Sequence, residues 1–210
     1  MLKLIDQILD QIPRDMLTDT ELVALIPGSA AARYNQTKRA LAKKELIQIR
    51  RGLYYLAKRY QRHGVNLYEL AQGIYGPSYV SFESALSFHG LIPEAIYGVD
   101  SASAKRSRVF KTPFGVFTYT QIPPRVFPEG VERIERDGHV FLLATPLKAL
   151  ADYVYVRRLN WAGVAPLVES LRIEREQLKF QARELEILAG TYASARVSRF
   201  LKGLKKDLGL

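Results

Sequence analysis

The chain has 210 residues, of which 48% are hydrophobic, and this size suits one compact domain or two small ones. It has no cysteine, which excludes disulfides and thiolate metal sites, and no apolar stretch approaches the roughly 20 residues that span a bilayer. The first residues are interrupted by acids and lack the apolar core of a signal peptide, so we expect a cytoplasmic protein.

The formal net charge of +10 is concentrated in one segment. Residues 29–64 hold ten Lys or Arg against a single acid, Glu45, whereas residues 1–28 carry a net charge of −3. Residues 65–189 balance fourteen basic against fourteen acidic side chains, and residues 190–210 carry a net charge of +4. Clustered cations bind a polyanion by releasing its counterions. Because a merely soluble basic surface has the same charge, the secondary structure has to discriminate between the two interpretations.

Three helices are expected before residue 45. Residues 2–12 place Leu and Ile at helical spacing, and Pro13 ends that pattern. A second helix begins near Thr18 or Asp19, either of which can cap free backbone N–H groups, and Pro27-Gly28 breaks the chain after it. Ser29 can cap a third helix that reaches residue 44. Two helices joined by a short turn that contains Gly are the arrangement of a helix-turn-helix.

The third helix divides into two faces at about 100° per residue. We expect one face to pack on the first two helices, through Ala30, Tyr34, Thr37 and Leu41. The other face presents Ala32, Asn35, Gln36, Arg39 and Lys43, with Arg33 and Lys38 at its flanks. Asn and Gln can pair with adenine, Arg with guanine, and the methyl of Ala or Thr can contact the thymine methyl. A surface helix of any globular protein is also polar outside, so this pattern alone does not decide the function.

A basic hairpin follows the third helix. Residues 46–50 and 53–56 alternate like two strands, and Arg51-Gly52 between them supplies a tight turn. A short hairpin directly after a recognition helix is typical of a winged helix, and Arg50 and Arg51 at its tip are expected to meet phosphate or enter the minor groove. We therefore predict a winged helix-turn-helix domain that binds DNA over residues 1–60. The predicted DNA-binding residues are Ser29, Arg33, Asn35, Gln36, Lys38, Arg39, Lys43, Arg50 and Arg51.

The rest of the chain predicts a connector with one helix over residues 61–78 and a second domain over residues 79–210. Asn66 caps the helix of the connector, and a further helix is expected over residues 82–88. Strands are expected at residues 96–99, 108–111, 116–121, 131–134 and 140–143, and helices at 145–158, 164–171, 173–188 and 194–208. The predicted fold class is α+β, with a winged helix-turn-helix followed by a mixed domain that has a mostly antiparallel sheet and C-terminal helices.

The last helix is expected to be amphipathic. Its basic residues recur at intervals of three or four and therefore share one face: Arg196, Arg199, Lys202 and Lys206. The opposite face offers apolar side chains for packing, among them Val197, Phe200 and Leu204. The basic face is either a solvated surface or one that competes for an acidic or nucleic-acid-binding surface of a partner.

No catalytic or metal-binding constellation can be assembled from the sequence. Gly28-Ser29 is similar to the Gly-Ser loop of minimal nucleotidyltransferases, but the paired carboxylates that would hold Mg²⁺ are missing, since the next acid is Glu45. His63, His89 and His139 have no partner four residues away, so a zinc site is not expected. We expect no enzyme activity, no cofactor and no metal.

Several segments resemble the AbiEi-type antitoxins. They are Arg51-Gly52-Leu53-Tyr54-Tyr55-Leu56, the stretch from Tyr79 to Glu94 (YVSFESALSFHGLIPE), Thr112-Pro113-Phe114-Gly115 with Tyr119, and Ala144 to Asp152 (ATPLKALAD). The resemblance spans residues 51–152 and implies a winged helix that represses its own operon and a C-terminal domain that antagonises a nucleotidyltransferase toxin, AbiEii. Such type IV toxin–antitoxin pairs need not form a stable complex. Family members often carry Glu where this chain has Leu147, so any role of that acid is missing here.

Three hypotheses follow for the function. The first is an antitoxin that represses transcription from inverted repeats in operator DNA, with two protomers per operator. The second is a stand-alone winged-helix regulator whose C-terminal domain senses a ligand or dimerises. The third, an enzyme targeted to nucleic acid, lacks the carboxylate or His constellation that it needs. A neighbouring nucleotidyltransferase toxin gene would favour the first hypothesis over the second.

Overall fold

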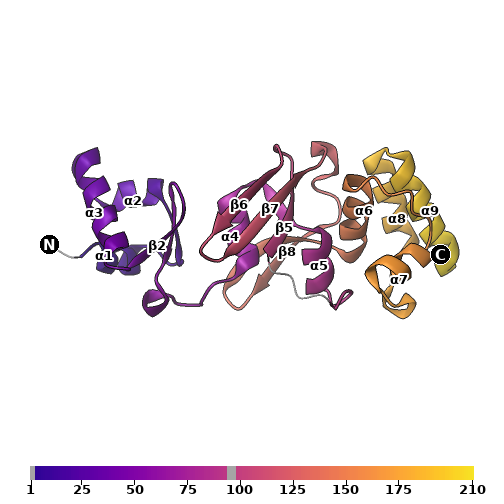
Figure 1. The fold of residues 1–210 in the computed structure, drawn as a ribbon, viewed down its shortest axis with the longest axis horizontal. Coiled ribbons are helices and arrows are strands. Elements are labelled where there is room, and N and C mark those ends of the chain that lie inside the picture. Colours follow the sequence, from indigo (N-terminus) through magenta and orange to yellow (C-terminus); the bar gives the residue numbers. More distant parts are fainter. Residues whose placement is uncertain (1–2, 94–97) are drawn as a thin grey trace.

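The computed structural model describes residues 3–93 and 98–210 and has an α+β fold with two sheets. Three parts follow one another along the longest axis of the molecule: three helices with a small sheet, a large sheet, and the C-terminal helices (Figure 1). Within the described residues, no helix combines the length and the apolar character needed to cross a bilayer.

The first unit consists of three helices and a three-stranded sheet. In chain order its elements are α1 (Leu4–Gln11), β1 (Met16–Thr18), α2 (Asp19–Leu25), α3 (Ala30–Ala42), β2 (Leu46–Arg50) and β3 (Leu53–Leu56). The strands are antiparallel, in the order β1-β3-β2. The three predicted helices and the hairpin are confirmed. The sequence prediction lacks β1, because three residues are too few for an alternating pattern to be recognised.

Caps and one glycine set the boundaries of these elements. Thr18 and Glu21 form a capping box that starts α2, in which the Glu21 carboxylate accepts the Thr18 backbone N–H at 2.8 Å. The Ser29 hydroxyl accepts the Ala32 backbone N–H at 3.2 Å and so starts α3. In the turn between β2 and β3, Gly52 has a φ of +77°, which residues with a side chain rarely adopt.

A connector joins this unit to the large sheet through η1 (Lys58–Tyr60) and α4 (Leu67–Ile74). The buried Asp15 carboxylate fixes the connector, because it accepts the backbone N–H of Arg62 at 3.0 Å and that of His63 at 3.3 Å. The Asn66 side chain caps α4, as predicted. Since α4 packs on strands of the large sheet, it belongs structurally to that sheet.

The large sheet has six strands in the order β6-β7-β5-β4-β9-β8. Its elements are β4 (Ser78–Val80), α5 (Phe82–Phe88), β5 (Gly98–Ser103), β6 (Arg108–Thr112), β7 (Gly115–Gln121), η2 (Pro124–Val126), β8 (Val131–Arg136) and β9 (His139–Ala144). Residues 96 and 97 of one predicted strand lie outside the described residues, and the sequence prediction lacks β4.

The large sheet is mixed, so the prediction of a mostly antiparallel sheet is only partly right. The hairpins β6–β7 and β8–β9 and the pair β4–β5 are antiparallel, whereas β4–β9 and β5–β7 are parallel. The parallel pairs join strands that are not consecutive in the chain. Local turn chemistry, on which the prediction was based, fixes only the direction of hairpins.

Four helices follow the sheet: α6 (Pro146–Val156), α7 (Ala165–Leu171), α8 (Ala182–Tyr192) and α9 (Ala195–Leu208). The helix predicted over residues 173–188 is wrong in its first part. Arg172 has a left-handed backbone that ends α7, and residues 175–177 form the short turn η3 (Arg175–Gln177). Buried Ile173 and Leu178 hold this irregular segment against the core, while Gln181 and Glu184 form the capping box that starts α8.

Two hydrophobic clusters share the β2–β3 hairpin. Leu46, Tyr54 and Leu56 belong to the cluster of the first unit, whereas Ile49, Leu53 and Tyr55 belong to the cluster of the large sheet and the C-terminal helices. The hairpin is therefore covered on both faces rather than projecting freely. The domain limits predicted at residues 60 and 78 stay predictions.

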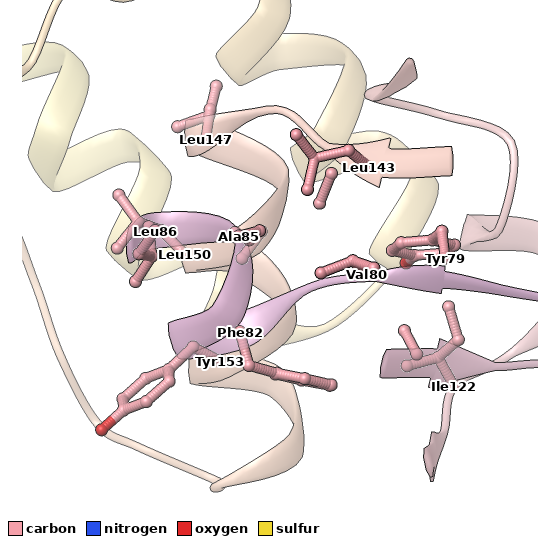
Figure 2. Packing of buried hydrophobic residues seen from close by; sticks show 14 of the residues in the cluster. Tyr79, Val80, Phe82, Ala85, Leu86, Ile122, Leu143, Leu147, Leu150 and Tyr153 are labelled. Atoms are coloured by element: carbon pink, nitrogen blue, oxygen red, sulfur yellow. The ribbon is translucent and has the colours of Figure 1, made fainter. Parts of the chain in front are cut away.

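Two segments of the resemblance meet in the second cluster. Figure 2 shows side chains of β4, α5 and α6 converging, with Phe82 and Leu86 of α5 beside Leu150 and Tyr153 of α6. The two helices pack directly on each other. Residues of the stretches 79–94 and 144–152 thus build one core.

Candidate nucleic-acid interface

Helix α3 turns a different face outward from the one predicted. Ala40 is its only buried residue, whereas Tyr34, which was expected to pack inward, is 67% exposed. The exposed stripe runs through Ala31, Asn35 and Lys38 as well as Tyr34. The helix is thus rotated by about a quarter of a turn from the predicted orientation. The prediction gave the large aromatic ring more weight than the small side chain of Ala40, which faces the core.

Seven of the nine predicted DNA-binding residues are exposed. Ser29 and Arg50 are held by hydrogen bonds, and the other five are Asn35, Lys38, Arg39, Lys43 and Arg51. Their polar groups make no hydrogen bond or ion pair with other side chains in the described part of the chain. Four of them are on α3, and Arg51 is at the turn between β2 and β3. A cation without an internal partner is available to a phosphate group.

Three other predicted residues are engaged inside the first unit. The Ser29 hydroxyl caps α3, and the Arg33 guanidinium donates to the Gly28 carbonyl at 2.6 Å. Gln36 is half-buried and lines a small recess on the side of α3 that faces α1, together with Leu4, Arg39 and Lys43. Gln36 is partly covered there, whereas Arg39 and Lys43 are exposed.

Arg50 connects the hairpin to the second unit. Its Nε donates to the Ile74 carbonyl at the end of α4, at 2.8 Å, and its Nη1 donates to the Arg51 carbonyl at 2.9 Å. We expected both tip arginines to be free for DNA. The structure instead gives Arg50 a fixed position between the hairpin and α4 and leaves the Arg51 side chain exposed.

Further basic residues of the second unit surround the same junction. The Lys105 ammonium and the Arg108 guanidinium lie 5.4 and 5.8 Å from the centre of the Tyr75 ring, directly after Ile74. The Tyr75 hydroxyl donates to the Arg106 carbonyl at 3.1 Å. All three basic side chains are exposed. The balanced charge of residues 65–189 as a whole conceals these cations, although residues 101–128 contain five basic residues and no acid.

A recess of about 550 Å³ separates α3 from α2 and the hairpin. Its lining combines apolar side chains such as Val23 and Tyr34 with basic ones such as Lys38 and Arg51. Asp19 also lines it, and its backbone N–H donates to the Gly52 carbonyl at 3.1 Å. Burial, together with the hydrogen bond to Asp19, raises the pKa of Tyr54 to about 12, so this hydroxyl stays protonated at neutral pH.

Helix α9 carries the second predicted surface at the opposite end of the molecule (Figure 1). Arg196, Arg199, Lys202 and Lys206 are all exposed on one face. The opposite face is buried through Val197, Phe200, Leu201 and Leu204, so the predicted amphipathic geometry is confirmed. The role of this face stays a prediction.

A buried ionic network lies beneath the C-terminal helices. Lys148 and Asp152, one turn apart on α6, are both fully buried, with 3.3 Å between Nζ and Oδ1. Lys148 also donates to the Val126 carbonyl at 2.7 Å and to the Tyr192 hydroxyl at 2.9 Å. Asp152 accepts from Tyr79 at 2.8 Å, from Ser81 at 2.7 Å and from Tyr192.

The protonation of this network follows from its burial. Burial lowers the pKa of Lys148, and Asp152 acts in the opposite direction. Burial and the nearby carboxylate raise the pKa of Tyr79 and of Tyr192. Lys148 and Asp152 are fully buried and paired with each other, so the geometry of the network indicates a structural tie between β4, α6 and α8. The i, i+4 spacing of Lys148 and Asp152 was its only sequence signal.

Two histidines that are distant in the sequence come together, the exposed His63 of the connector and the buried His139 of β9. The rings of His63 and His139 are 6.0 Å apart between centroids, and His139 Nδ1 lies 2.7 Å from Glu69 Oε2. Across residues 3–93 and 98–210, no set of three or more His, Cys, Asp or Glu residues is placed to hold a metal ion.

Comparison with protein-family models finds no match for this chain, and comparison with curated proteins finds none either.

Proposed function

We propose that this protein is a DNA-binding repressor that reads its operator with a winged helix in the first unit. The observation that carries the proposal is a set of exposed side chains on α3, Asn35, Lys38 and Arg39, that have no partner among the described side chains, together with Arg51 at the hairpin turn. The order α1-β1-α2-α3-β2-β3 is consistent with a winged helix, in which the helix before the hairpin enters the major groove.

Each part of the interface then has a separate task. Asn35 pairs with adenine in the major groove, while Lys38, Arg39 and Lys43 neutralise phosphates on either side. Arg51 meets the backbone next to the site, and Arg50 fixes the hairpin by its bond to Ile74. The exposed cations around Tyr75 extend the basic surface beyond the hairpin. The DNA contact therefore covers more than the first unit.

The resemblance to AbiEi-type antitoxins supports a more specific role. In that role the protein represses its own operon, as two protomers on inverted repeats, and its second unit antagonises a nucleotidyltransferase toxin without a stable complex. The basic face of α9, formed by Arg196, Arg199, Lys202 and Lys206, is the surface that would oppose an acidic site of the toxin.

The DNA-binding proposal is tested by the salt dependence of binding. Replacing Lys38 and Arg51 together by Gln should lower the slope of log K against log salt concentration by about 2, because two phosphate contacts are lost. The matched control replaces Arg199 and Lys202 by Gln, which changes the net charge equally but at the other end of the molecule. Fluorescence anisotropy with a labelled promoter duplex measures both variants. An equal change of slope in the two double variants would mean that DNA binding depends on net charge alone and not on the α3 surface.

The antitoxin role is tested with the full chain, because the hairpin contributes to both hydrophobic clusters and a truncated second unit would expose its apolar face. Cells that express an AbiEii-type nucleotidyltransferase toxin are supplied with either of two double variants. Lys38→Glu with Arg51→Glu should lose repression and still relieve toxicity, whereas Arg199→Glu with Lys202→Glu should do the reverse. Loss of both activities in either variant would contradict the assignment of repression to the first unit and of toxin antagonism to the second.

A stand-alone regulator is the alternative, and a groove of about 230 Å³ between α8 and α9 favours it. The groove is lined by Leu185, Ala189 and Leu201 together with the charged Glu186, Lys202 and Lys205. Absence of any toxin gene near the operon, together with a ligand that changes operator affinity, would favour this second function.

A further inference from the structure

The surface of the first unit exposes apolar side chains where its charge is highest. Tyr34 is 67% exposed on α3 and Val23 is 52% exposed on α2, and both line the 550 Å³ recess beside the hairpin. Ala30 lines the same recess, and Ala31 continues the exposed stripe of α3. Exposed apolar groups that gather in a recess indicate a binding surface more often than isolated ones do.

The charge around the recess selects the kind of partner. Arg33, Lys38 and Arg51 line it, and residues 29–64 carry a net charge of +9. The Asp19 carboxylate also lies at the recess, next to Gly52 in the hairpin turn. A polyanion that also presents apolar groups matches such a surface. Double-stranded DNA does so in its major groove, where the C5-methyl of thymine is the apolar group.

We infer that the α3 recess reads thymine methyl groups, so that each operator half-site is built on A·T base pairs. The inference rests on the proposed DNA-binding function and adds the base preference. Asn35, the one amide on the exposed stripe, is suited to adenine, while Tyr34, Val23 and the methyl of Ala31 are suited to the thymine methyl. Gln36 is half-buried, and we expect it to make no base contact.

The experiment begins with selection of bound sequences from a random 20-base-pair duplex library by the full-length protein. The selected half-site should contain A·T pairs at its centre. Deoxyuridine then replaces each thymine of that half-site, which removes only the methyl group. Loss of one buried methyl should weaken binding about fourfold, the effect of one CH₂ group removed from water.

Variants assign the effect to the recess. In Tyr34→Ala and Val23→Ala the thymine and uracil duplexes should bind with nearly equal affinity, because the apolar contact is gone. Both side chains are largely exposed, so the fold should be retained. The matched control is Val168→Ala on α7, another exposed valine, which should keep the fourfold difference.

The outcomes separate the inference from the proposed function. Selection of a half-site with a G·C centre, or equal affinity of the wild-type protein for thymine and uracil duplexes, overturns the thymine reading and leaves DNA binding intact. Failure to enrich any sequence, with no salt-dependent binding to DNA, overturns the proposed function itself and the inference with it.

Discussion

Helices α3 and α9 both carry clustered positive charge, and they lie at opposite ends of the molecule (Figure 1). Helix α9 buries Val197, Phe200, Leu201 and Leu204, so its basic face is what remains after an apolar face has been packed. Helix α3 buries only Ala40 and turns its largest apolar residue, Tyr34, toward solvent. Clustered charge alone therefore does not identify a binding surface. The apolar groups left uncovered beside the charge distinguish α3 from a solvated amphipathic helix.

The largest expected effect concerns the packing that holds α9. Helix α9 packs on α6 and α8, which the Lys148–Asp152–Tyr192 network ties together. Asp152→Asn should lower the free energy of unfolding by about 3–5 kcal/mol, because it leaves the Lys148 charge buried without its partner. Since burial lowers the pKa of Lys148, the folded state binds fewer protons than the unfolded state as the pH rises. The loss of unfolding free energy caused by Asp152→Asn should therefore become smaller in alkaline solution.

Urea unfolding followed by circular dichroism measures this change. The control is Tyr192→Phe, which removes a hydroxyl but no charge and should cost about 1.5–3 kcal/mol, because that hydroxyl bonds two charged groups. If Asp152→Asn cost no more than Tyr192→Phe, the network would not be what holds the C-terminal helices.

The next effect compares two neighbours on α3. Asn35→Ala should weaken binding to the selected operator by about 1–3 kcal/mol, because Asn35 is on the exposed stripe and suited to adenine. Gln36→Ala should change it by less than about 0.5 kcal/mol, since Gln36 faces α1. Isothermal titration with specific and scrambled duplexes gives both values. If Gln36→Ala weakened operator binding more than Asn35→Ala, the face of α3 predicted from the sequence would be the one that contacts DNA.

The start of each helix offers a smaller, matched test. The Ser29 hydroxyl caps α3, whereas Ser194 at the start of α9 makes no side-chain cap bond. Ser29→Ala should therefore destabilise the first unit by about 1 kcal/mol, and Ser194→Ala should cost only a few tenths. Thermal unfolding of the two variants measures the difference. Equal costs would mean that the cap contributes little to positioning α3.

The smallest effect is expected from the charges of α9. Arg199→Gln combined with Lys202→Gln should leave the free energy of unfolding within about 0.5 kcal/mol of the original, because both side chains are exposed. Operator affinity at 0.15 M salt should also stay unchanged. A loss of operator affinity comparable to that of Lys38→Gln with Arg51→Gln would place α9 in the DNA interface and abolish the contrast between the two helices.

Features that depend on near neighbours in the chain could be predicted from the sequence. The capping residues Thr18, Ser29 and Asn66, the tight turn at Gly52 and the two faces of α9 follow from a few consecutive residues. The concentration of charge in residues 29–64 is likewise a property of the chain alone. Local hydrogen bonds and side-chain periodicity are sufficient for these features.

Which surfaces are covered depends on how distant segments pack together. The rotation of α3 depends on how closely Ala40 approaches the core, and the position of Arg50 depends on a carbonyl 24 residues away. The pair Tyr79–Asp152 joins residues 73 positions apart, and the parallel strand pairs join segments that no short turn connects. Such contacts form only when distant segments pack together, so no local pattern of residues specifies them.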